Sequence, residues 1–206
     1  MKKPAADLPS LPRLMLVTDR HFTNGRDLVD VIAEACTAGL RFIQVRERDL
    51  PGRIVRDLVR DLLDVVAPGT HIVVNGRAEV AEETGCGLHL PAAAPYADPL
   101  PALWGRAVHD EKEARRAVSG GARYLVVGTI FPTPSKPQDP GTGVGLIERI
   151  VAVARDVPVF AIGGVDAGRV AEVRSAGAYG VAVRRAILSA REPAAATREL
   201  LERLHG

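Results

Sequence analysis

Short apolar runs alternate with longer amphipathic stretches along most of the chain. Runs of this kind, bounded by glycine, proline or polar residues, are typical of buried parallel strands because they are too short for free-standing helices. The expected strands cover residues 14–18, 42–47, 71–75, 87–90, 104–108, 124–130, 157–162 and 180–183.

The stretches between the expected strands have the periodicity of helices. Apolar residues recur at Leu28, Val31, Ile32 and Ala35, which is the spacing of one helix face, and Gly39 ends this stretch. Segments 91–95 and 131–143 instead have the prolines and glycines of loops, and a loop as long as the second is usually functional or mobile. The expected helices cover residues 27–38, 51–67, 77–84, 110–118, 146–154, 168–175 and 193–204.

The alternation of strand and helix predicts the α/β class and one (β/α)8 TIM barrel. We expect a single domain over residues 1–206, with residues 1–12 as a loose N-terminal extension. A doubly wound open sheet is the alternative fold, but the chain lacks the early G-x-G-x-x-G motif that would favour it.

The composition narrows the class of protein. Among 206 residues, 47% are hydrophobic and 25% are charged, as in an ordinary globular domain. A formal net charge of +2 and an aromatic content of 4% argue against a nucleic-acid partner. Cys36 and Cys86 lack C-x-x-C spacing, so we expect buried thiols in a reducing compartment. We find no membrane-spanning run and no signal peptide, which predicts a cytoplasmic protein.

In a TIM barrel the active site is built at the carboxyl ends of the strands. Arginine and lysine there would make a mouth that attracts anions, and Arg46 is suited to bidentate binding of a phosphate or a carboxylate. Glu47, between Arg46 and Arg48, is more simply explained by an ion-pair cluster at the rim. By position, the polar candidates are Gln44, Arg46, Arg48, Asn75, Arg77, His89, His109, Thr129, Thr133, Ser135 and Lys136.

A glycine pair, Gly163 and Gly164, follows the seventh expected strand. Two residues without Cβ let an anion approach backbone N–H donors. The loops after the last two strands of such a barrel commonly bind a phosphate, so we expect a phosphate site here together with Val183 and Arg184. The alternative is that the glycines only close a tight turn.

Two histidines are candidates for acid–base chemistry. His109 directly follows the fifth expected strand, so its ring is expected to face the mouth, where imidazole can exchange protons at neutral pH. We therefore predict His109 as the catalytic residue, the alternatives being substrate hydrogen bonding or a place beside a helix cap. His89 lies within its strand, which favours a hydrogen-bonded histidine of the barrel wall.

Seven motifs, in order over nearly the whole chain, resemble those of the thiamine phosphate synthase superfamily; they begin at Leu16, Gln44, Val74, Gly87, Val127, Ala161 and Gly177. Synthases of this superfamily join a hydroxymethylpyrimidine pyrophosphate to a thiazole phosphate with Mg²⁺. The resemblance implies that Gln44 faces the pyrimidine, and that Gly164 and the loop after Val183 hold the thiazole phosphate. For the pyrophosphate it implies Arg46, Arg48, Asn75 and Lys136.

The resemblance to synthases breaks at the metal site. The synthase pattern has aspartates at the positions of Gly76 and Ala94, and neither residue here can replace the carboxylates that Mg²⁺ prefers. A sister branch, the thiazole tautomerases, is similar to this chain at the Asn-Gly-Arg sequence from Asn75 and at the segment that ends in His109. Gln44 and the loop from Thr133 to Lys136 are similar to the synthases instead.

These features lead to the hypothesis of a metal-independent thiazole tautomerase of thiamine biosynthesis that needs no cofactor. His109 would move a proton within a carboxythiazole phosphate whose carboxylate Arg46 holds. The alternatives are a thiamine phosphate synthase, which would need Mg²⁺, and a non-catalytic protein that binds thiazole or thiamine phosphate. We expect a small-molecule thiazole phosphate as partner, neither nucleic acid nor membrane, and a homo-oligomer.

Overall fold

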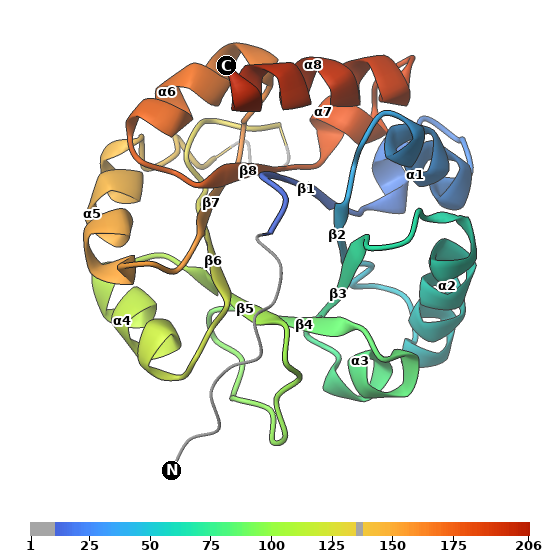
Figure 1. The fold of residues 1–206 in the computed structure, drawn as a ribbon, viewed down its shortest axis with the longest axis horizontal. Coiled ribbons are helices and arrows are strands. Elements are labelled where there is room, and N and C mark those ends of the chain that lie inside the picture. Colours follow the sequence, from blue (N-terminus) through green and yellow to red (C-terminus); the bar gives the residue numbers. More distant parts are fainter. Residues whose placement is uncertain (1–10, 135–137) are drawn as a thin grey trace.

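The computed structural model, which describes residues 11–134 and 138–206, is a closed barrel of eight parallel strands surrounded by helices (Figure 1). Each strand pairs with the next one in sequence, and β8 closes on β1 with Leu14 opposite Val181. This confirms the predicted (β/α)8 barrel. The strands are β1 (Leu14–Val17), β2 (Phe42–Val45), β3 (His71–Asn75), β4 (Gly87–Leu90), β5 (Trp104–Val108), β6 (Tyr124–Val127), β7 (Val159–Ile162) and β8 (Gly180–Val183).

The interior of the barrel is filled by aromatic side chains. Side chains alternate across each strand, so one set faces the barrel axis and the other faces the helices. The rings of Phe42, Tyr124 and Phe160 meet edge to face, with centroids 5.3–5.9 Å apart. Tyr124 fits because Gly105, on the neighbouring strand, has no Cβ, and an added one would collide with its ring. The packed interior leaves the barrel ends as places for a ligand.

The helices pack on the outward-facing residues of the strands and bury the larger of the two apolar cores. Aspartates cap two of the α-helices: Asp27 accepts hydrogen bonds from the N–H groups of Val29 and Asp30, and Asp110 accepts one from the N–H of Glu113. Among the described residues, no helix combines the length and the apolar character needed to cross a membrane. The helices are η1 (Arg20–Phe22), α1 (Leu28–Thr37), α2 (Gly52–Val65), α3 (Ala78–Thr84), α4 (Glu111–Ser119), α5 (Gly145–Ala154), η2 (Ala167–Arg169), α6 (Val170–Ser175), α7 (Arg185–Leu188) and α8 (Pro193–His205).

One connection of the barrel lacks a helix, in agreement with the loop predicted at residues 91–95. Between β4 and β5 the chain runs through residues 91–103 without a helix. Prolines at positions 91, 95, 99 and 101 explain this, because proline lacks an N–H donor and disfavours helical backbone in the residue before it. A difference from the prediction is the short helix α7 directly after β8, where no helix was expected.

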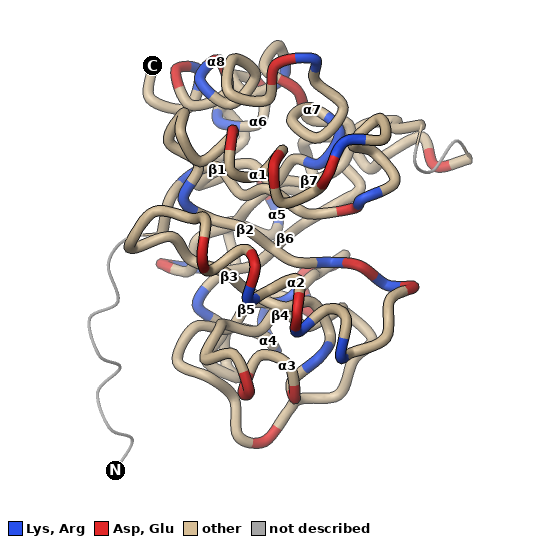
Figure 2. Tube along the Cα trace, turned by 90° about the vertical axis from the view of Figure 1, so that its right-hand side faces the viewer, with Lys and Arg blue, Asp and Glu red and all other residues tan. Residues whose placement is uncertain are grey.

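Charged residues are distributed along the whole trace (Figure 2). Basic and acidic residues alternate over the outer helices, which agrees with the small net charge. In this view the trace shows no extended region of one charge sign, such as a nucleic-acid-binding protein would have. Positively charged side chains are instead concentrated locally, at the carboxyl ends of the strands.

Candidate functional site

The floor of the candidate site is a pair of side-chain amides. Gln44 of β2 and Asn75 of β3 both continue the inward-facing series of their strands. The Gln44 Oε1 accepts a hydrogen bond of 3.0 Å from Asn75 Nδ2, and Gln44 Nε2 lies 3.6 Å from Met15 Sδ. Gln44 is buried, whereas Asn75 keeps partial exposure. The barrel thus brings together two of the residues predicted for the site.

His89 lies in the barrel wall on β4, where it is paired in register with Asn75 of the neighbouring strand. Its Nδ1 lies 3.1 Å from the Tyr124 hydroxyl, and the two rings are stacked. Burial lowers the pKa of His89 to about 3, with smaller contributions from the nearby cations Arg46 and Arg106. The ring is therefore neutral at pH 7. This agrees with the prediction from the sequence that His89 is a hydrogen-bonded histidine of the barrel wall.

Glu47 is committed to an ion-pair network at the rim. Its Oε1 accepts a hydrogen bond of 2.7 Å from the Thr18 hydroxyl, and its Oε2 accepts one of 3.2 Å from Arg20 Nη1. Arg20 also binds both oxygens of Asp49 at 2.7 Å and holds the pKa of that carboxyl at about 2. Glu47 thus forms an ion pair, as expected, but its partner is Arg20 and not the adjacent Arg46 or Arg48, and both oxygens of the buried carboxylate are engaged.

Three arginines surround the mouth. Burial lowers the pKa of Arg46 to about 10, and repulsion from Arg48 and Arg184 adds to this shift. Within the described part of the chain, the guanidinium of Arg46 has no hydrogen bond or ion pair. Arg184 pairs with Asp19 at 2.9 Å and lies over the ring of Phe22. Guanidinium groups are cations at neutral pH, so the mouth attracts anions.

Asp19 was missed as a site residue by the sequence analysis. It lies two residues after β1, at the carboxyl end of the strand where the other polar candidates were predicted, so its position in the chain was the available signal. Its role depends on Arg184, which is 165 positions away along the chain. Barrel closure brings the two together, because β1 pairs with β8.

The glycine pair lies between two loops. Gly163 has φ +103° and Gly164 has φ +64°, values that favour glycine. A Cβ on Gly164 would lie 2.6 Å from the carbonyl oxygen of Pro132, so the loop after β6 passes directly against it. The Phe131 N–H donates to the Gly163 carbonyl at 3.0 Å, which fixes this contact. The tight-turn interpretation accounts for these contacts, and phosphate binding stays a prediction.

The remaining residues of the predicted phosphate and substrate sites are only partly placed. Val183 ends β8, which pairs with β7, so Val183 and Arg184 adjoin the Gly163–Gly164 turn. Thr133 belongs to the loop after β6. Ser135 and Lys136 lie outside the described residues.

His109 lies at the exposed end of β5. Its side chain is 57% exposed, and its Nδ1 is 3.3 Å from Glu113 Oε2, a partner four residues along on α4. The backbone N–H of His109 donates to the same oxygen at 2.8 Å. The ring thus contacts α4, the helix that follows it, at the rim of the barrel, whereas the amide of Gln44 in the floor is buried.

At the two positions where the synthase pattern places its metal carboxylates, this chain offers no side-chain ligand for Mg²⁺. No group of three or more metal-binding side chains (His, Cys, Asp or Glu) occurs within residues 11–134 and 138–206. Gly76 and Ala94 supply no side-chain ligand, and the loop that carries Ala94 is held by a cation instead. Arg106 donates through Nη2 to the carbonyls of Ala92 and Ala94. These residues do not fit the metal that the family resemblance implies.

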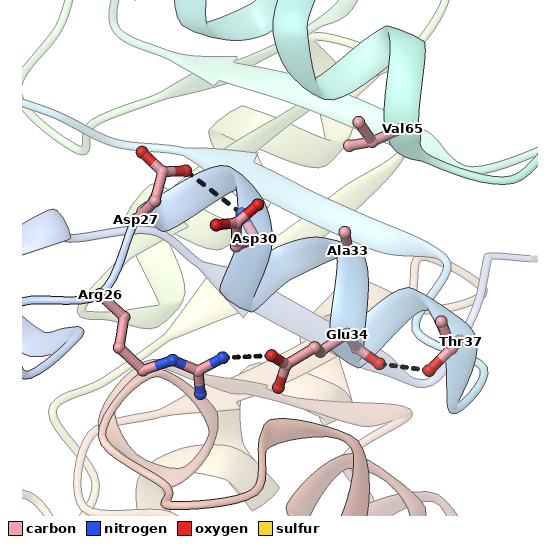
Figure 3. Close-up of a pocket in the computed structure, with 7 residues that line it drawn as sticks. All are labelled: Arg26, Asp27, Asp30, Ala33, Glu34, Thr37 and Val65. Carbon is pink, nitrogen blue, oxygen red and sulfur yellow. Dashed lines mark hydrogen bonds and ion pairs between the residues drawn. The ribbon is translucent and has the colours of Figure 1, made fainter.

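A hollow on the outer surface lies along α1 and is separate from the mouth (Figure 3). Its polar groups already serve the helix, because Asp27 caps α1 and Arg26 pairs with Glu34. We therefore place the candidate site at the carboxyl ends of the strands and not in this hollow.

The closed barrel, with amides and arginines gathered at the carboxyl ends of its strands, defines an enzyme of the (β/α)8 class. The chain belongs to the thiamine monophosphate synthase family, whose model matches residues 14–187.

Individual relatives agree with the family. A thiamine-phosphate synthase of Roseiflexus castenholzii is 37% identical over 91% of this chain and 86% of its own. A thiamine-phosphate synthase of Mycobacterium sp. (strain KMS) is 35% identical over 99% of both chains. Among solved structures, a thiamine phosphate pyrophosphorylase from Pyrococcus furiosus superposes with a TM-score of 0.82 at 28% identity, covering 94% of this chain and 95% of its own.

These relatives overturn the hypothesis of a thiazole tautomerase. Proteins similar over the whole barrel are named as synthases, which supports the alternative of a transferase. The tautomerase hypothesis depended on a few positions, chiefly Gly76, Ala94 and His109, and the similarity over the rest of the chain outweighs them. The role of general base predicted for His109 belonged to the isomerisation, and we do not transfer it to the synthase reaction.

Proposed function

We propose that this chain is a thiamine-phosphate synthase, a transferase that joins a hydroxymethylpyrimidine pyrophosphate to a thiazole phosphate and releases pyrophosphate. The observation that carries the proposal is the identity of 37% and 35% to named synthases over 91% and 99% of the chain. The pattern of charge at the mouth supports it, because both substrates of this reaction are anions.

The side chains of the mouth fit distinct parts of the two substrates. The Gln44–Asn75 pair offers the amide donors and acceptors that a pyrimidine ring can use. Arg46 and Arg48 are suited to the pyrophosphate, whose negative charge grows as it departs. The turn at Gly163 and Gly164, with Val183 and Arg184 beside it, is the proposed site of the thiazole phosphate.

In this proposal the side chains of the mouth, and not a protein-bound metal ion, neutralise the charge of the pyrophosphate. In the family reaction Mg²⁺ neutralises phosphate charge, but Gly76 and Ala94 stand where the synthase pattern has its two metal carboxylates. We therefore assign charge neutralisation to the guanidinium groups alone. Homo-oligomer formation stays a prediction, which light scattering on the purified protein would test.

A coupling assay tests the proposed function. Purified protein is incubated with both substrates, and thiamine phosphate is measured by chromatography, with either substrate omitted as control. Arg46→Gln should lower kcat/KM by about 10- to 100-fold, the effect of losing one charge-assisted hydrogen-bonding group. Failure of the wild-type protein to form thiamine phosphate under any metal condition would refute the proposal.

A further inference from the structure

Arg106 is a buried cation on the outer side of the barrel. Gly105 faces the barrel axis, where it makes room for the Tyr124 ring, and side chains alternate along a strand. Arg106 therefore faces outward, under the connection of residues 91–103 (the β4–β5 loop), and is only 8% exposed. A buried charge is costly unless its donors find acceptors, so the contacts of this guanidinium indicate what it does.

The guanidinium of Arg106 holds the β4–β5 loop. Its Nη2 donates to the carbonyl oxygen of Ala92 at 2.7 Å and also to that of Ala94. The same group lies 4.6 Å from the centre of the Tyr96 ring, and the Tyr96 hydroxyl donates to the Arg116 carbonyl oxygen of α4 at 3.2 Å. Arg106 Nη1 is buried without a hydrogen-bond partner among the described residues. The bonds to the loop are thus the ones that offset the burial of this charge.

The start of the β4–β5 loop borders the amide floor of the site. β4 pairs with β3, and the carbonyl oxygen of His89 accepts a hydrogen bond of 2.8 Å from the Gly76 N–H. Pro91 lies against Gly76, because a Cβ placed on Gly76 would be 3.5 Å from the Pro91 ring. Asn75, which donates to Gln44, is the residue next to this contact. A shift of the loop would therefore reach the floor directly.

We infer that Arg106 is a positioning residue for the pyrimidine half of the site. By holding the loop carbonyls it keeps Pro91 against Gly76, and it thereby keeps the Asn75 amide in place. This inference rests on the proposed function, which assigns the pyrimidine to Gln44 and Asn75. The proposed thiazole phosphate site belongs to β7 and β8, on the opposite side of the closed barrel from β4. Loss of the Arg106 contacts should therefore affect one substrate and not the other.

The test is calorimetric titration of the full chain with the hydroxymethylpyrimidine pyrophosphate and, separately, with the thiazole phosphate. Arg106→Met keeps the length of the side chain but removes its donors. It should weaken pyrimidine binding by about 10-fold and leave the affinity for the thiazole phosphate within about 2-fold of the wild type. Arg106→Lys keeps the charge without the planar fork, so its affinity for the pyrimidine should fall between those of the wild type and Arg106→Met.

Arg174→Met is the matched control. The Arg174 Nη1 also donates to two carbonyl oxygens, of Ala178 and, at 2.7 Å, of Tyr179, but these residues precede β8 at the amino end of the barrel. Its loss should lower stability without changing the affinity for either substrate, which separates positioning from a general loss of stability. Circular dichroism and thermal unfolding measure how far each variant is folded and how stable it is.

Several results would overturn the inference. These are unchanged pyrimidine binding by folded Arg106→Met, equal weakening for both substrates, or the same selective loss in Arg174→Met. If Arg106→Met does not fold, Arg106→Lys decides, and wild-type affinity of that variant for both substrates would overturn the inference. The selective loss in a protein that forms no thiamine phosphate would refute the proposed function alone. Coupling activity without the selective loss would refute this inference alone.

Discussion

Asp19 and Arg184 form an ion pair, with 2.9 Å between Oδ2 and Nη1, across the seam where β1 closes on β8. Both side chains are about four-fifths buried, with exposed fractions of 19% and 23%. The pair therefore joins the two ends of the barrel sequence and directs a cation towards the mouth. It links the closure of the fold to the charge of the site.

The first prediction concerns the stability that this pair provides. Asp19→Asn should lower the free energy of unfolding by roughly 1–3 kcal/mol, because the largely buried guanidinium of Arg184 loses its charged partner. Urea denaturation followed by circular dichroism measures the change. Asp57→Asn, on the exposed side of α2, is the matched control and should stay within about 0.5 kcal/mol of the wild type. Equal stability of Asp19→Asn and the wild type would show that the pair contributes nothing.

The second prediction concerns the contact between the loops after β6 and β7. Gly164→Ala forces both a left-handed backbone on alanine and a clash with the Pro132 carbonyl oxygen, 2.6 Å from the new Cβ. Gly25→Ala, at φ +80°, carries the same kind of backbone penalty with nothing within 4 Å of its Cβ. We expect a loss of about 1–2 kcal/mol for Gly25→Ala and a further 1–3 kcal/mol for Gly164→Ala.

Urea denaturation of both glycine variants separates two costs, the contact of the new Cβ with the Pro132 carbonyl oxygen and the left-handed backbone of alanine. If the two variants lose the same stability, the close approach of Pro132 does not constrain the turn. The coupling assay on Gly164→Ala adds a functional measure, and KM for the thiazole phosphate should rise because the turn is displaced.

The third prediction concerns pH. Burial holds the pKa of His89 at about 3, whereas an unfolded histidine titrates near 6.5. Between these values the unfolded chain binds a proton that the folded chain does not, so stability falls as pH is lowered from about 6.5 towards 3. Above about pH 6.5 the two states bind equally, and this contribution to the pH dependence vanishes. The slope from this residue is about 1.4 kcal/mol per pH unit.

Urea titrations between pH 4 and pH 7 measure this slope. His89→Gln should reduce the slope by about 1.4 kcal/mol per pH unit, which corresponds to one proton. His205→Gln, which changes an exposed histidine at the end of α8, should keep the wild-type slope. A wild-type slope in His89→Gln would mean that His89 is not held neutral by the fold.

The barrel was predictable because its signals are local. Each strand is an apolar run that turn residues delimit, and Gly39 or the Pro68-Gly69 pair marks a helix end within the same stretch of chain. An ion pair for Glu47 was expected from the arginines on either side of it, but its partner is Arg20, which lies 27 positions earlier in the chain and was not predictable from the local sequence. The connection without a helix between β4 and β5 was predictable as well, because four prolines lie within residues 91–103.

The site was only partly predictable because its contacts join distant positions. Asp19 gains its role from Arg184, and the 165 positions between them are bridged only when the barrel closes. The hydrogen bond of Gln44 to Asn75 likewise joins two strands. The choice between isomerase and transferase failed for a related reason, because few positions at the mouth were weighed against similarity along the whole chain.

The most direct test of the proposed function is the amount of pyrophosphate released per thiamine phosphate formed. The purified protein is supplied with both substrates, and the two products are measured in the same time course. The account predicts equal amounts of both products and no pyrophosphate release when the thiazole phosphate is omitted. Pyrophosphate without thiamine phosphate, or no turnover of either substrate, would contradict it.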